Sequence, residues 1–297
     1  MLAHTTMVST YAVLIGLLTT MPAAATPFLF STGDPDGKMA TASRPGTAGK
    51  IEIESGDDFV LTSTTAITSA KFTGLLTGNA TVGEVRVEIY RVFPNDSNVA
   101  RTSGPPTFST SQVPTRVNSP SDVEFTDRDT ASSNLTFATN VLSGNFTALN
   151  SVLNGINPSP GQRTGGEGAV TGTEVQLDVN FTQPFTLPPN HYFFVPQVEV
   201  TDPSGNFFWL AAPRPIVAPG TPFPAGFTDL QEWIRNENLA PDWLRVGTDI
   251  VGGMPAQTFN ATFSLAGTVP EPGSWSLLGA ALAGLGLVQL RRGRARS

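Results

Sequence analysis

The sequence contains no cysteine and little positive charge. With no cysteine among the 297 residues, disulfides, thiolate nucleophiles, zinc–thiolate sites and iron–sulfur clusters are all excluded. Residues 26–269 carry thirteen Lys and Arg against twenty-three Asp and Glu, a formal charge of −10. Nucleic acids are polyanions that are bound through Lys and Arg, so we expect no nucleic-acid partner.

Catalytic motifs are also scarce. The only histidine outside the first few residues is His191, and no serine lies in a G-x-S-x-G sequence. A Ser-His-Asp triad is therefore a minor alternative to an ordinary strand-edge histidine. Asp34 and Asp36 precede Gly37 at the spacing of early calcium ligands. The later ligands are missing, so a turn is favoured. We predict no catalytic residue, no cofactor and no metal ligand.

The dominant pattern is the alternation of apolar and polar residues, which is typical of half-buried strands. It is clearest at 85–90, 175–181 and 259–265, and further strands are expected at 58–61, 66–76, 134–139 and 192–200. This spacing predicts an all-β fold, an antiparallel, jelly-roll-like β-sandwich. The best candidate for a helix is 229–235, where Leu230, Trp233 and Ile234 would share one face.

Three stretches rich in Pro and Gly interrupt the strands, at 93–120, 155–173 and 211–227. We expect them to be long loops and to carry any binding surface. No interval between them is large enough for a core of its own, so a single domain over 26–267 is expected.

Aromatic residues gather in two stretches, 207–210 and 229–243. They could supply stacking platforms for sugar rings in an exposed groove. Continuous apolar runs usually indicate burial on both faces, however, so packing in the core is the favoured interpretation.

The N-terminus has the features of a signal peptide. A short apolar run at 11–18 is followed by Met21-Pro22-Ala23-Ala24-Ala25. A helix breaker and small residues in an A-x-A pattern predict cleavage after Ala25. Residues 1–25 are therefore expected to be removed on export.

The C-terminus has three parts in order: a Pro-rich motif, an apolar segment and a basic end. The segment 275–290 contains no charged residue and would form a helix about 24 Å long, nearly enough to span a bilayer. The arginines after it would hold the C-terminus on the cytoplasmic side. Prolines on both sides of Glu271 keep that residue extended just before the predicted transmembrane helix. The basic stop consists of Arg291, Arg292, Arg294 and Arg296.

Residues 268–297 resemble the PEP-CTERM sorting domain of bacterial exported proteins. The matching residues are Val269, Pro270, Glu271 and Pro272, followed by the transmembrane segment and the arginines. The resemblance implies recognition and removal of the tail by an exosortase, a membrane transpeptidase-like enzyme. The body, through segments such as 30–33, 101–106 and 242–250, resembles surface proteins that carry the same tail and have no assigned activity.

We therefore expect a non-enzymatic exported protein of the cell surface or extracellular matrix. The precursor would be anchored in the membrane, and an exopolysaccharide is a partner that the tail's family implies. Two alternatives stay open. One is a secreted carbohydrate-binding or carbohydrate-active domain, including a glycoside hydrolase, with its site in the long loops. The other is a calcium-stabilised adhesin module.

Overall fold

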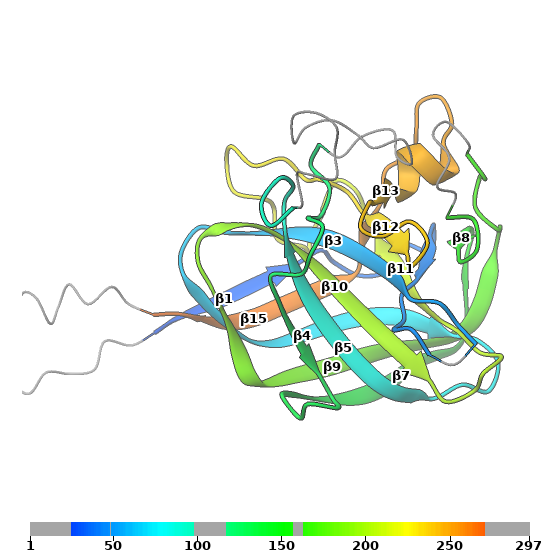
Figure 1. Ribbon diagram of the computed structural model, residues 1–297, viewed down its shortest axis with the longest axis horizontal. Helices are drawn as coiled ribbons and strands as arrows, with labels where there is room; N and C mark the ends of the chain where they lie inside the picture. The colour runs from blue at the N-terminus through cyan, green and yellow to red at the C-terminus, as the bar shows by residue number, and fades with distance from the viewer. Residues whose placement is uncertain (1–24, 48, 98–116, 157–162, 271–297) are drawn as a thin grey trace, which may run out of the picture. The chain divides into compact units, whose positions relative to one another are not determined.

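The computed structural model describes residues 25–47, 49–97, 117–156 and 163–270. Residues Thr26–Pro270 form one compact unit built from two β-sheets (Figure 1). All strand pairs are antiparallel except the short parallel pair β2–β8. The expected mostly-β fold with two sheets is confirmed.

The larger sheet has nine strands. Its longest path runs β1 (Thr26–Ser31), β15 (Phe263–Val269), β4 (Thr65–Leu76), β11 (Phe207–Ala212), β2 (Ala40–Ala42) and β8 (Ser151–Val152). The other edge of β4 pairs with β9 (Val170–Leu187), which in turn pairs with β7 (Leu135–Ala148). The two-residue strand β14 (Asn260–Ala261) pairs with β11.

The smaller sheet has six strands. Their order is β13 (Leu244–Arg245), β12 (Trp233–Asn236), β3 (Ile53–Leu61), β10 (Asn190–Val200), β5 (Val82–Arg91) and β6 (Thr126–Asp129). The central strand β3 is buried along its whole length. One face of β3 therefore meets the larger sheet, and the other is covered by loops.

The main core lies between the two sheets. Alternate residues of β9, from Val175 to Phe181, point inward and are buried, as their sequence pattern predicts. Aromatic rings from both sheets meet in the middle: Phe194 of β10 stacks on Phe263 of β15 with centroids 5.0 Å apart. The indole of Trp209 donates a hydrogen bond of 2.7 Å to the carbonyl of Thr262. Burial of these large side chains is the main source of stability.

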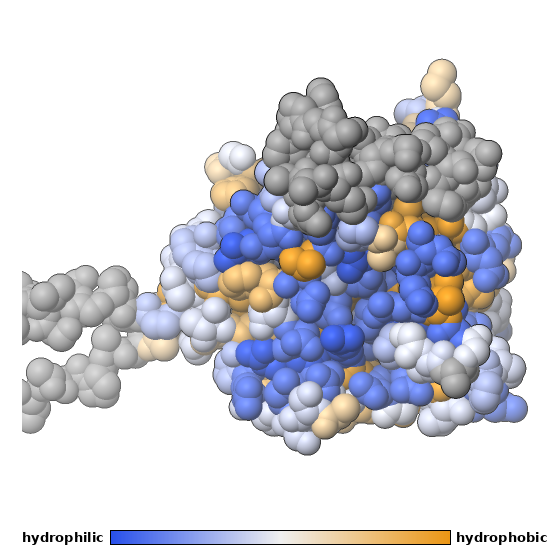
Figure 2. Space-filling view, in the orientation of Figure 1, coloured by the Kyte–Doolittle hydropathy of each residue, from blue (hydrophilic) through white to orange (hydrophobic). Residues whose placement is uncertain are grey.

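The face shown in Figure 2 is predominantly hydrophilic, interrupted by apolar patches. This distribution agrees with an acidic chain whose large aromatic residues lie inside. Trp209, Trp233 and Trp243 are all essentially inaccessible to solvent. The interpretation of the aromatic stretches as core was therefore right, and these residues form no exposed stacking platform.

The prediction of a helix at 229–235 is wrong. Residues 233–236 form strand β12, which extends the smaller sheet through the pair Trp233↔Gly56. Trp233 and Ile234 are both buried because the strand is covered on both faces, and consecutive buried residues imitate one face of a helix. The one helix in the described part of the chain is a short π-helix, η2 (Val246–Val251).

The long loops are shorter than expected. Strand β9 begins at Val170, inside the stretch predicted as the second loop, and β11 runs on through Ala212 at the start of the third. Residues 98–116 of the first stretch and 157–162 of the second lie outside the described residues.

Candidate functional site

The first and last strands of the body lie side by side. Strand β1 pairs with β15 along its whole length, and the register joins Thr26 to Val269 (Figure 1). Pro270, the next residue, is exposed, and so is Ala25, which precedes β1 in the chain. The predicted leader cleavage site thus directly precedes the first strand, and the predicted sorting motif begins with the last residue of the final strand.

The other predicted sorting residues lie outside the described part of the chain. They are Glu271, Pro272, the transmembrane segment 275–290, and Arg291, Arg292, Arg294 and Arg296. Residues 1–24 of the predicted signal peptide also lie outside it. No helix within residues 25–270, as far as the structure describes them, is long and apolar enough to cross a membrane.

The outer face of the smaller sheet carries a buried charged cluster. Arg235 of β12 forms an ion pair with Glu54 of β3, and its Nη2 also donates to the Tyr90 hydroxyl at 2.8 Å. The Tyr90 hydroxyl lies 2.7 Å from Glu54 and 2.9 Å from Glu88. Trp243 covers the cluster, with the Arg235 guanidinium 4.3 Å from the ring centroid. Three strands of this sheet, β12, β3 and β5, thus supply the polar groups, and a loop residue covers them.

The two carboxyls of this cluster differ in protonation. Burial and the neighbouring charge of Glu54 raise the pKa of Glu88 to about 8. Burial would also raise the pKa of Glu54, but the Arg235 guanidinium outweighs it and lowers that pKa. A protonated and an ionised carboxyl could exchange a proton. Both are only 3% exposed, however, so no substrate can reach them. The cluster therefore ties β12 to β3 and β5.

A second pair on the same sheet involves His191. Its Nε2 lies 2.5 Å from Asp58 Oδ2, and Asp58 Oδ1 accepts a hydrogen bond of 3.0 Å from the Leu230 amide. Burial raises the pKa of Asp58 to about 6, although the hydrogen bond from His191 opposes the shift. The imidazole packs against Phe223 and Phe227. His191 thus holds a loop on the sheet, and no described serine hydroxyl bonds to it.

Two further carboxyls are buried between the sheets. Continuing the register Trp233↔Gly56 by one residue brings Glu232 opposite Asp57. Asp57 accepts a hydrogen bond of 2.9 Å from the Ala261 amide, and Glu232 accepts one from the Thr41 hydroxyl. Both donors belong to the larger sheet. These two acids therefore connect the sheets.

Neither of these acids has a cationic partner in the part of the chain that the structure describes. Desolvation raises the pKa of Glu232 to about 8. Desolvation, followed by the negative charge of Asp58, raises the pKa of Asp57 well above its usual range. Asp57 Oδ1 and Glu232 Oε2 have no hydrogen-bond partner among the described residues. Glu232 is thus mostly protonated at neutral pH, and the protonated form of Asp57 is favoured over its usual balance.

The Asp34–Gly37 segment forms a turn, as favoured. Asp36 accepts a hydrogen bond from the Lys38 amide and lies 3.2 Å from the Lys38 ammonium, while Gly37 has a positive φ of 70°. No group of three or more His, Asp and Glu side chains in the described ranges could hold a metal ion.

Sequence reasoning missed the buried charged groups. The available indication was the segment 52–58, which contains four acidic residues and leads straight into an apolar run. Acidic residues of this density predict an exposed loop. Glu54, Asp57 and Asp58 are nevertheless buried here, where Arg235, Tyr90 and backbone amides from distant segments hydrogen-bond to them.

Comparison with known proteins identifies the tail. Residues 268–292 match the family model of the PEP-CTERM protein-sorting motif. No curated protein and no solved structure matches the chain. The resemblance of the tail is confirmed, whereas the expected resemblance of the body to other proteins finds no support. The motif implies an exported precursor that passes a membrane and is processed by an exosortase-type system.

Proposed function

We propose that this chain, which carries a PEP-CTERM protein-sorting motif, is a non-enzymatic protein of the cell surface or extracellular matrix. Its β-sandwich body is the delivered part, and its tail is the delivery signal. One observation supports this division of labour: the last strand of the body ends at Val269, and residues 268–292 match the sorting motif, so the strand and the match share only Thr268 and Val269. Within the described residues, the sheet therefore uses only these two residues of the tail.

The topology of the precursor follows from its two ends. The leader 1–25 would start export, and the helix 275–290 with its four arginines would stop it. The body would then lie outside the cytoplasm. An intact β1–β15 pair leaves no linker between the sheet and Pro270. The body would stay attached to the membrane through the tail until the tail is removed, and processing would release it.

Intact-mass measurement on the mature protein from an exosortase-containing host tests this proposal. We expect loss of residues 1–25 and of the tail beyond Val269. The variant Glu271→Ala should retain the tail and remain in the membrane fraction. The matched control Glu237→Ala changes an exposed glutamate of the body and should be processed normally. A mature surface protein with an intact tail in such a host would contradict the proposal.

Two alternative functions stay open, a carbohydrate-binding domain and a calcium-stabilised module. A carbohydrate-binding domain can no longer use Trp209, Trp233 or Trp243, which are buried. A calcium-stabilised module stays a prediction. Melting curves with calcium and with a chelator test it, and equal midpoints would remove it.

A further inference from the structure

A cavity of about 360 Å³ lies at one end of the β-sandwich. It is lined by the hairpin between β2 and β3, by the end of β10, and by the segment that leads into β11. Its buried floor includes Val198 and Phe207, while Gly49, Thr201 and Pro203 are exposed at its rim. A buried floor and an exposed rim describe an open pocket of the size that small ligands occupy.

Two basic side chains line this pocket, Arg44 and Lys50. Arg44 donates to the Asn206 side chain at 2.9 Å and to the Ile51 carbonyl at 3.2 Å. Lys50 donates to the Gly205 carbonyl at 2.5 Å. Neutral oxygens thus orient both cations. No carboxylate of the described residues lies within 4.0 Å of either one.

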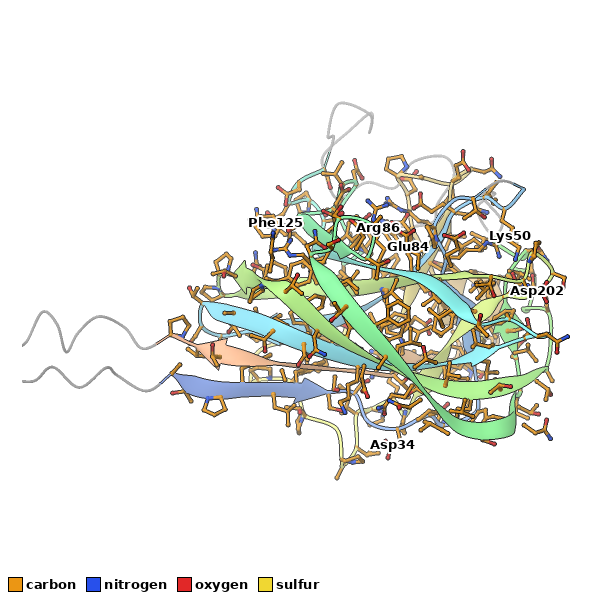
Figure 3. The ribbon with its side chains drawn as sticks, turned by 90° about the horizontal axis from the view of Figure 1, so that it is seen from below. Asp34, Lys50, Glu84, Arg86, Phe125 and Asp202 are labelled. Carbon is orange, nitrogen blue, oxygen red and sulfur yellow. The ribbon has the colours of Figure 1, made fainter. Side chains whose placement is uncertain are left out.

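The electrostatic environment favours an anion of low charge. Burial, and next the proximity of Arg44, lower the pKa of Lys50, which indicates that the two cations repel each other. A bound anion would relieve this repulsion. The acidic residues Glu199 and Asp202 are close by, and Figure 3 shows Lys50 and Asp202 at the same end of the body. They would repel a phosphate or polysulfate more strongly than a single carboxylate.

The remaining lining specifies the rest of the ligand. Thr47 and Asn206 offer hydroxyl and amide groups that can pair with ligand hydroxyls, whereas the Thr201 hydroxyl is bonded to Thr81. Pro45, Val200 and Pro203, which are partly or fully exposed, offer apolar surface for the C–H face of a ring. We propose that this pocket binds a uronic acid, a sugar ring with one carboxylate, with Arg44 and Lys50 holding the carboxylate. The ligand could be a free monosaccharide or a unit of an acidic polysaccharide.

Calorimetric titration of the full chain in non-ionic detergent with glucuronate tests this proposal. Glucuronamide is the matched ligand control, because it lacks only the negative charge. We expect glucuronate to bind about tenfold or more tightly than glucuronamide. Binding should weaken as salt is added. Equal binding of the two compounds, or no binding of glucuronate up to about 10 mM, would overturn the proposal.

Variants of the protein provide a second test of the same site. Lys50→Met should weaken glucuronate binding about tenfold. The control Lys71→Met, an exposed lysine paired with Asp178 on the larger sheet, should bind as the wild type does. If the binding curves of the two variants coincide, the site lies elsewhere. Unchanged melting temperatures verify folding, and the glucuronamide comparison needs no variant.

Two further ligands, acetate and polygalacturonate, show whether the pocket recognises a bare carboxylate, a free sugar acid or a unit of a polymer. Acetate that binds as tightly as glucuronate would show a bare carboxylate site and overturn the sugar assignment. Polygalacturonate should bind in a Lys50-dependent manner if the pocket accepts a unit within a polymer. Binding restricted to the monosaccharide would assign the site to the free sugar acid. All these outcomes are independent of tail processing.

Discussion

Replacement of Glu232 by glutamine should remove a large part of the alkaline sensitivity of this protein. Glu232 is 1% exposed and has no cationic partner among the described residues, and desolvation raises its pKa from 4.5 to about 8. Glutamine has nearly the same shape and can still accept the hydrogen bond from Thr41. It stays neutral at every pH. The variant therefore isolates the ionisation of this one group.

The sign and size of the effect follow from proton binding. Below pH 4.5 the carboxyl is protonated in both the folded and the unfolded chain. Between pH 4.5 and about 8 only the unfolded chain ionises, so unfolding releases a proton and stability falls as pH rises. Each pKa unit corresponds to about 1.4 kcal/mol, so the full loss is about 5 kcal/mol. For a domain of this size, that is roughly 10–20 °C in melting temperature.

Thermal melts followed by circular dichroism from about pH 5 to about pH 9 measure this loss. Glu232→Gln and the wild type should melt within a few degrees of each other at the acidic end and diverge as pH rises. The control Glu237→Gln makes the same chemical change at an exposed position and should follow the wild type throughout. A gap between Glu232→Gln and wild type that stays constant with pH would refute the reasoning.

Two other substitutions test the packing. Arg235→Met leaves Glu54 buried without its ion partner, and chemical denaturation should show a loss of about 3–5 kcal/mol. The double variant with Glu54→Gln should regain part of it, and a double variant no more stable than the single would contradict this account. Gly74→Ala would place a Cβ 2.3 Å from the Phe207 ring and 2.5 Å from the Phe208 carbonyl oxygen, which should destabilise by about 1–3 kcal/mol. Gly144→Ala meets nothing within 4 Å, and an equal loss there would show that the effect is not steric.

The predictability of each strand depends on its surroundings. Strand β9 carries a regular alternation over Val175–Phe181 because one face meets the core, and its position follows from the sequence. Strand β12 and the first half of β3 show no such alternation, because loops cover their second face and bury the polar side chains there. Propensity and periodicity describe one chain segment at a time. They cannot reveal that Arg235 reaches Glu54 from 181 residues away.

The sorting tail could be recognised from the sequence alone because its function depends on a short contiguous motif. Val269, Pro270 and the residues after them are read in order, without help from the fold. The pocket around Arg44 and Lys50 is the opposite case, since it joins residues from three separate segments. A site of that kind becomes visible only when the chain is folded.

The pairing of β1 with β15 also bears on the order of events during synthesis and transport. Strand β15 separates β1 from β4 in the larger sheet, so the first strand has no neighbour there until the last one emerges. Closing a loop of almost the whole body is a slow, late step in folding. The emerging chain would therefore remain without its finished sheet, and open to threading through a translocation channel. The residues that complete the fold would then be the last to cross before the predicted transmembrane segment stops transfer.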